Sequence, residues 1–214
     1  MKTNSRTLRL FLLCLLWIAA LSAQETDEAV EPEKKKERFA IAFGAAAGNF
    51  ANDAANFTSI YSNRSISRIY FAGIGSSSFL FVGKYREFFA HGSSKVENIA
   101  VTGKAEWKQK FYSAGIRVRS NDQPIYAEVL YVITRAEESL TTVDPVVQEL
   151  TSRYETENKG VGFAVGFALK LIGPIGIYAE GEFSAMLRGG RNPQGKADPE
   201  LGGFCASAGL FFAL

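Results

Sequence analysis

Cysteine, histidine and long apolar runs are scarce in this chain. The 214 residues contain two cysteines and one histidine, His91. Cys14 lies in the N-terminal apolar run, so only Cys205 remains once that segment is removed, and one cysteine cannot form an internal disulfide. A single histidine and a single cysteine also give no basis for a metal site. We therefore expect no metal and no cofactor.

Beyond the N-terminal segment, no stretch reaches the ~18 consecutive apolar residues that a membrane-spanning helix needs. Lipid cannot hydrogen-bond the open edges of a sheet, so a chain of this kind can cross a membrane only as a closed barrel.

The N-terminal segment has the features of a secretory signal peptide. A positively charged start precedes an apolar run over residues 10–21, and Leu21-Ser22-Ala23 has the small residues of a cleavage site. We expect a signal peptide over 1–23, because the run is short for a membrane span. Residues 24–38 are charged, and we expect them to form a flexible periplasmic lead-in.

The charge of the remaining chain is close to balanced. Removing residues 1–23 takes away three cations and no acids, which leaves 21 Lys and Arg against 22 Asp and Glu. The formal charge is then −1, which excludes the strongly basic surface of a nucleic-acid-binding protein. We expect no nucleic acid among the partners.

Alternation of large apolar residues with small or polar ones begins at Phe39 and recurs to the C-terminus. It is clearest over 159–171, where Val161, Phe163 and Val165 alternate with Gly162 and Ala164. Such period-two patterns predict β-strands. The predicted strands are 39–50, 66–74, 79–90, 105–119, 124–135, 159–171, 175–187 and a last strand that ends at Leu214.

Long and short connections alternate between these strands. The predicted long loops are 49–65, 91–103, 136–158 and 188–200, and the predicted short turns lie at 75–78, 120–123 and 173–174. Membrane barrels have this asymmetry, with short periplasmic turns and longer outer loops. We therefore predict an all-β fold, an eight-stranded antiparallel up-and-down transmembrane β-barrel over 39–214. Both ends of the barrel would be periplasmic and the long loops extracellular. A soluble barrel or sandwich with its apolar residues inside is the alternative.

The final strand carries a further pattern. Ser207, Gly209, Phe212 and Leu214 follow the order polar, x, Gly, x, x, hydrophobic, x, hydrophobic. This order resembles the C-terminal insertion signal of bacterial outer-membrane β-barrels, which implies the barrel-assembly machinery as a partner. Over 39–214 the chain resembles the small eight-stranded outer-membrane proteins of the OmpX, OmpW and OmpA-barrel type. That resemblance implies a monomer in contact with lipid in the bacterial outer membrane.

Isolated charges fall on the small-residue faces and are expected inside the barrel. These are Lys84, Arg86, Arg117, Arg119, Glu128, Lys170, Glu180 and Glu182. The turn at 120–123 predicts that Arg117 lies near Glu128, and the turn at 173–174 predicts that Lys170 lies near Glu180. We expect a lumen bridged by ion pairs and filled by Phe111, Tyr126, Tyr178 and Phe211, because eight strands leave room only for side chains.

Two functions fit such a barrel. The first is a structural or surface-interaction protein whose outer loops meet an extracellular ligand, with loop 136–158 the longest candidate. The second is a narrow channel for ions or small hydrophobic compounds. Aromatic residues at strand ends are expected to form an interfacial girdle. They are Tyr70, Tyr85, Trp107, Tyr112 and Tyr131.

A lipid A-modifying hydrolase is a more remote alternative. His91 and Ser93 resemble the His-x-Ser-Asn stretch of the outer-membrane lipid A deacylases. That resemblance implies a catalytic triad of His, Ser and Glu. Ser94 stands where that family has Asn, and Glu97 and Glu106 are the nearest acids. We expect the protein not to be an enzyme.

Overall fold

The computed structural model describes residues 39–214 except 53–60, 62, 65, 77, 96–101, 120–123, 143–149 and 189–200. The predicted signal peptide and lead-in, 1–23 and 24–38, lie outside the described residues. Within the described part, no helix is long and apolar enough to span a membrane.

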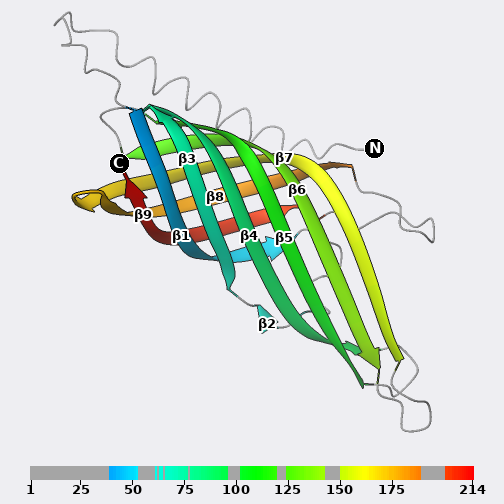
Figure 1. The fold of residues 1–214 in the computed structure, drawn as a ribbon. Helices are drawn as coiled ribbons and strands as arrows, with labels where there is room; N and C mark the ends of the chain where they lie inside the picture. Colours follow the sequence, from blue (N-terminus) through cyan, green and yellow to red (C-terminus); the bar gives the residue numbers. More distant parts are fainter. Residues whose placement is uncertain are drawn as a thin grey trace, which may run out of the picture. The chain divides into compact units, whose positions relative to one another are not determined.

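The described residues form eight long strands and one short strand (Figure 1). Their bounds are β1 Phe39–Asn52, β2 Asn63–Arg64, β3 Ser67–Ser76, β4 Phe79–Lys95, β5 Thr102–Arg119, β6 Ile125–Thr142, β7 Leu150–Ile172, β8 Ile175–Arg188 and β9 Gly203–Ala213.

Every long strand pairs antiparallel with two neighbours, so the sheet closes. Around the ring the order is β4, β3, β1, β9, β8, β7, β6 and β5, and β5 pairs again with β4. The short β2 adds to β4 at His91 and Ala90. Consecutive long strands are neighbours throughout, and β1 meets β9 at the seam. The predicted eight-stranded antiparallel up-and-down barrel is confirmed.

Large apolar side chains cover the outside of this barrel. On β7, Val165, Phe167 and Leu169 are exposed, whereas Ala164 and Ala168 are buried. The other strands likewise expose their large apolar residues. Examples are Phe39, Phe81, Val118, Val129, Ile175 and Leu210. Leaving such a side chain in water forgoes roughly 1.5–3 kcal/mol each. A band of this extent is stable only against lipid, which rules out the soluble alternative.

A row of tyrosines marks one border of the apolar band. Tyr85 lies opposite Tyr70 on one side and Tyr112 on the other. The ring centroids are 6.4 Å apart for Tyr70 and Tyr85 and 5.4 Å apart for Tyr85 and Tyr112. Tyr131 is also exposed. Trp107 is not part of the predicted girdle. It faces inward and is buried, because it falls on the opposite phase of β5 from Tyr112.

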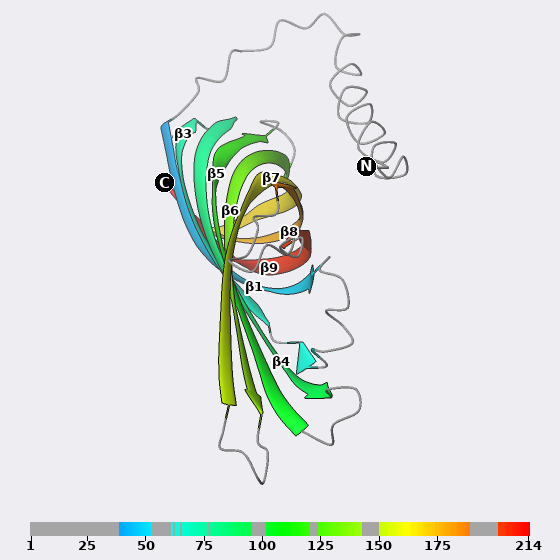
Figure 2. The ribbon, with the colours of Figure 1, turned by 90° about the vertical axis from the view of Figure 1, so that its right-hand side faces the viewer.

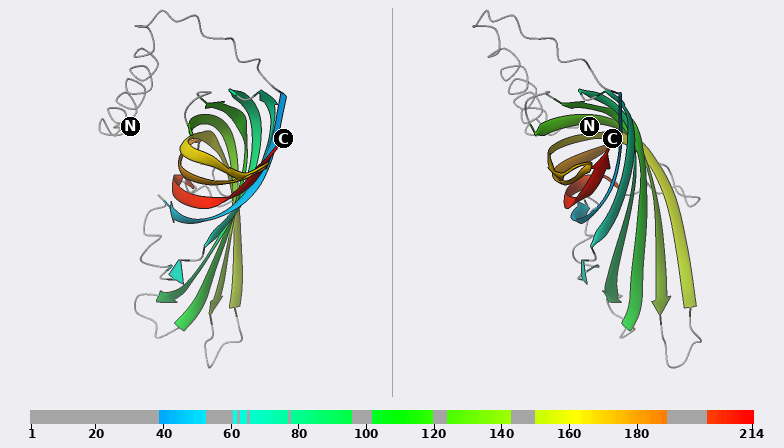
Figure 3. Two further views of the ribbon diagram at one scale, coloured as in Figure 1. Left: turned by 90° about the vertical axis from the view of Figure 1, so that its left-hand side faces the viewer. Right: turned by 60° about the vertical axis from the view of Figure 1, so that its left-hand side comes forward.

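Four strands continue well past the closed part of the barrel. β3 pairs with β4 only as far as Glu87, and β8 pairs with β7 only as far as Lys159. Beyond these points β4, β5, β6 and β7 remain paired to each other (Figure 2, Figure 3). We call the continuation the projecting sheet; it comprises 88–95, 102–110, 135–142 and 150–158.

The prediction of loops at 91–103 and 136–158 is therefore wrong over most of each segment. β6 and β7 pair as far as Thr142 and Leu150, so the segment 136–158 is mainly a hairpin. Its alternation is still present, but polar residues such as Glu137 and Glu138 occupy both phases. Without an apolar face, the strand pattern is lost in the sequence. The loop 49–65 is shortened by β1 and β2, and 189–200 lies outside the described residues.

Candidate functional site

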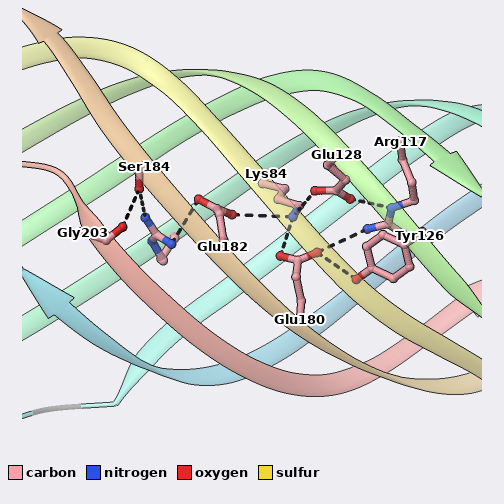
Figure 4. A network of polar contacts seen from close by, with 9 residues as sticks. Lys84, Arg117, Tyr126, Glu128, Glu180, Glu182, Ser184 and Gly203 are labelled. Carbon is pink, nitrogen blue, oxygen red and sulfur yellow. Dashed lines mark hydrogen bonds and ion pairs between the residues drawn. The ribbon is translucent and has the colours of Figure 1, made fainter. Parts of the chain in front are cut away.

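Charged side chains from β4 and β8 meet across the lumen (Figure 4). In the closed ring three strands separate β4 from β8 in either direction, so the two lie opposite each other. Lys84 and Arg86 extend inward from β4, and Glu180 and Glu182 extend inward from β8. Their ion pairs therefore join opposite walls of the barrel.

Lys84 is the centre of this group. Its ammonium contacts the carboxylate of Glu128 and lies 2.6 Å from Glu180 Oε1 and 3.6 Å from Glu182 Oε2. The Lys84 side chain is only 4% exposed. One cation thus contacts three converging carboxylates at a buried position.

Two arginines complete the charge balance. Arg117 Nε donates to Glu128 Oε1 at 2.5 Å, and its guanidinium lies 4.1 Å from the centre of the Tyr126 ring. The Tyr126 hydroxyl donates to Glu180 Oε2 at 2.8 Å. Arg86 Nη1 lies 3.2 Å from Glu182 Oε1. Planar guanidinium groups suit this combination of carboxylate and ring contacts.

Arg86 is held by neutral groups as well. Its Nη2 donates to Ser184 Oγ at 3.3 Å, and its guanidinium lies 3.9 Å from the centre of the Phe111 ring. We call the charged set the lumen network. It consists of Lys84, Arg86, Arg117, Glu128, Glu180 and Glu182. Three cations match three carboxylates, as buried charges require.

The sequence prediction placed Lys170 in this group, and the structure corrects it. Lys170 is exposed and lies opposite Gly176 at a register irregularity, whereas Glu180 lies opposite Gly166. The irregularity breaks the alternation at the end of the hairpin, so residues 169–172 are all exposed. Glu180 contacts Lys84 instead.

Arg117 and Arg119, which were also predicted to face the lumen, lie close to their predicted positions. Arg117 lies directly opposite Glu128 in the register, one step from the predicted diagonal. Arg119 is half-buried near the end of β5. The cross-lumen pairs were missed because a hairpin argument relates only neighbouring strands. They could have been predicted from closure of the ring, which places β4 opposite β8.

A buried aromatic cluster fills the lumen on the side of the projecting sheet. Phe50 packs against Phe88 and Phe111, with ring centroids 5.2 and 5.0 Å apart. Two residues outside the strands join this cluster, Tyr61 and Leu201. Gln109 Nε2 donates to the Leu201 carbonyl at 2.8 Å, which fixes the approach to β9 over the lumen.

Tyr61 also contacts the projecting sheet from outside the strands. Its ring lies 5.8 Å from that of Trp107, and its hydroxyl donates to Glu138 Oε1. Burial, then the hydrogen bond and the negative charge of Glu138, raise the pKa of Tyr61. The phenol therefore stays protonated and remains a donor at physiological pH.

The opposite end of the lumen is filled by a second buried cluster. Phe71 and Tyr178 meet edge to face with ring centroids 5.2 Å apart, and Tyr126 and Phe211 join them. Small wall residues make room: a Cβ on Gly166 would lie 2.2 Å from Tyr126 Cζ. The lumen network and the two clusters together form three layers of buried side chains, which fit structural packing better than conduction.

The predicted insertion-signal residues lie at the seam of the barrel. Phe212 lies opposite Phe43 of β1, and their rings stack with centroids 5.1 Å apart. Leu214 exchanges backbone hydrogen bonds with Ile41, of 2.9 and 3.2 Å. Ser207 and Gly209 lie further along the same pairing, opposite Gly48 and Ala46. The last residues therefore complete the contact between the first and last strands.

The candidate hydrolase residues do not form a triad in the described part of the chain. His91 lies opposite Glu106 on the outer face of the projecting sheet, and both are exposed. No contact between their side chains occurs among the described interactions, and the side chain of Ser93 and the whole of Glu97 lie outside the described residues. The described residues also contain no cluster of three or more His, Cys, Asp and Glu that could hold a metal.

Comparison with known proteins gives similarity at the level of structure alone. No family model and no curated protein sequence matches the chain. Ail, the attachment invasion locus protein of Yersinia pestis, is 14% identical, with 81% of this chain and 97% of that chain covered and a TM-score of 0.49. Neisserial surface protein A is 13% identical, with 81% and 96% covered and a TM-score of 0.41. The N-terminal barrel domain of Pseudomonas aeruginosa OprF is 10% identical, with 84% and 100% covered and a TM-score of 0.34.

These structural neighbours are small outer-membrane barrels. Their similarity to this chain is too distant to transfer a ligand or an activity. The membrane-barrel assignment rests on the closed sheet and on the apolar outer surface of this chain.

Proposed function

We propose that the protein is a bacterial outer-membrane β-barrel with a structural and surface-interaction role, and that the projecting sheet is its contact surface. The observation that carries this proposal is the contrast between the two parts of the chain. The lumen is packed with buried side chains, whereas four strands extend past the apolar band. A barrel of this form presents a surface outside the membrane and offers little room within.

The projecting sheet has the chemistry of a water-exposed contact surface. Its outer face carries charged residues such as Lys104, Glu106, Glu155 and Glu157, all exposed. β7 pairs with β6 over 150–158, and the described residues provide no second neighbour for this edge. An extracellular ligand would therefore be bound mainly by this sheet and by the connections 96–101 and 143–149.

The remaining partners follow from the same geometry. Lipid would cover the apolar band, and the C-terminal strand would be recognised by the barrel-assembly machinery during insertion. The closed ring leaves the barrel itself without a free edge, which favours a monomer.

The orientation of the barrel is testable with two protease sites. A recognition sequence inserted between Thr142 and Leu150 is expected to be cut by protease added to intact cells, because the projecting sheet would be extracellular. The same sequence inserted between Arg119 and Ile125 is expected to be cut only in permeabilised cells. Both variants must show the heat-modifiable gel migration of a folded barrel. Cleavage of only the second site in intact cells would contradict the orientation.

A narrow channel is the second candidate function, and conductance separates it from the first. Purified barrel in a planar bilayer is expected to show no single-channel steps, because the lumen network and both clusters occupy the interior. Steps that persist in repeated preparations, and that change in size when Glu180 is replaced by Gln, would establish the channel instead.

A further inference from the structure

Three neighbouring strands end their apolar runs with a cation. On the outer face of β5, Tyr112 is followed by Lys110; on β6, Ile133 is followed by Arg135. On β7, Lys159 follows Val161 in the same way. We call Lys110, Arg135 and Lys159 the basic boundary patch. Each is the first outward-facing side chain beyond the lipid-facing residues of its strand.

The ion pairs of the described residues neutralise this patch only in part. Arg135 Nε lies 2.8 Å from Glu157 Oε2, and Lys159 Nζ lies 3.9 Å from Glu157 Oε1. One carboxylate thus serves two cations. Glu87, the acid opposite Lys110, lies 3.4 Å from Lys108 instead.

Lys110 completes the excess of positive charge. It lies directly opposite Arg135 in the register, and no ion pair of Lys110 occurs among the described residues. Like charges at opposed positions of a sheet are unfavourable without a counter-ion. With Glu157 counted, the patch carries a formal charge of +2, which one or two anionic oxygen groups would balance.

The position of the patch identifies the kind of anion. The apolar outer residues of β5, β6 and β7 that adjoin the patch must be covered by lipid acyl chains. The headgroups of those lipids must therefore lie where the apolar runs end. A lysine or arginine at this depth extends its charged end toward the headgroups. Clusters of cations beside an apolar membrane surface attract anionic lipid headgroups.

We propose that Lys110, Arg135 and Lys159 bind the phosphate of a phosphorylated membrane lipid whose acyl chains lie on the adjoining apolar band. The proposal rests on the membrane location proposed above. It adds a ligand class and a site, which lies on the outer wall where the barrel passes into the projecting sheet and not in the lumen.

The experiment uses the folded full-length barrel in detergent and native mass spectrometry to measure lipid binding. The probes are a bis-phosphorylated lipid A-type glycolipid, the same lipid without phosphates, and inorganic phosphate as a competitor. The wild-type protein is expected to bind the phosphorylated lipid more tightly than the dephosphorylated one. The variant K110Q/K159Q, which leaves the Arg135–Glu157 pair intact, should lose about 25-fold in affinity for the phosphorylated lipid, since each cation near an anionic surface contributes roughly a factor of five.

The variant K104Q/K170Q is the matched control. It removes two exposed lysines of the same type, one on the projecting sheet and one at the opposite end of the barrel, and should bind like the wild type. Equal binding by K110Q/K159Q and the wild type would overturn the proposal. So would full competition by millimolar inorganic phosphate, which would assign the site to a free anion.

Heat-modifiable migration and fractionation separate this result from a failure of the proposed function. If all variants are folded and recovered with the membrane but show no phosphate-dependent binding, only the lipid site is wrong. If the wild-type protein is recovered in the soluble fraction, the membrane location itself is wrong.

Discussion

Replacing Lys84 with methionine is expected to lower the free energy of unfolding by about 3–5 kcal/mol, the usual cost of removing one partner from a buried ion pair. Lys84 lies among Glu128, Glu180 and Glu182, so its loss leaves three carboxylates with only two arginines. Methionine has a similar length, and the change therefore removes charge with little change in volume. Urea unfolding of the barrel in lipid vesicles, followed by tryptophan fluorescence, gives the measurement.

Two further variants separate charge balance from other causes. K170M removes an exposed lysine and should change the free energy of unfolding by less than about 0.5 kcal/mol, as surface substitutions do. The double variant K84M/E180Q restores equal numbers of cations and carboxylates and should recover part of the lost stability. If K84M is as stable as K170M, the lumen network does not hold the barrel together.

Replacing both Phe212 and Leu214 with alanine is expected to abolish insertion of the barrel in cells. These side chains lie in the closing strand, and Phe212 stacks on Phe43 across the seam. The backbone hydrogen bonds of Leu214 to Ile41 do not need the side chain. The purified variant should therefore still refold in detergent micelles, where the assembly machinery is absent. Outer-membrane fractionation and heat-modifiable migration measure the two steps separately.

F204A is the matched control for this prediction. Phe204 is an exposed apolar residue on the same face of β9, but it lies outside the terminal pattern. It should insert in cells like the wild type. If F204A and the terminal variant fail equally, loss of apolar surface explains the defect. If the terminal variant fails to refold in micelles as well, its defect lies in closing the seam.

The period-two alternation was enough to predict the class of fold. Val165 and Ala164 fall on opposite faces because successive side chains in a strand point to opposite sides. The Gly-Pro pair at 173–174 predicted a tight turn, and Gly173 has a φ of 54°, in the left-handed region that glycine adopts readily. The short turn at 120–123 predicted Arg117 near Glu128, because a short hairpin fixes which residues face each other.

The sequence pattern predicts less where a residue's partner is distant along the chain or where the alternation of apolar and polar residues is weak. Alternation predicts Lys170 inside the lumen, but it lies beside a register irregularity at the end of the hairpin, where it is exposed. The polarity of residues 136–158 hides the strand period and predicts a loop, yet pairing between β6 and β7 keeps 136–142 and 150–158 extended.

The sequence by itself thus determined the apolar parts of the eight strands, their alternation and their large apolar face, since these depend on side chains a few residues apart. Only the tertiary structure decided that Lys84 contacts Glu180. It also decided how the charges around Lys110, which lies opposite Arg135, are paired. The first contact spans the closed ring, and the second depends on which side chains of several strands reach each other. Neither can be found from the pattern of one strand.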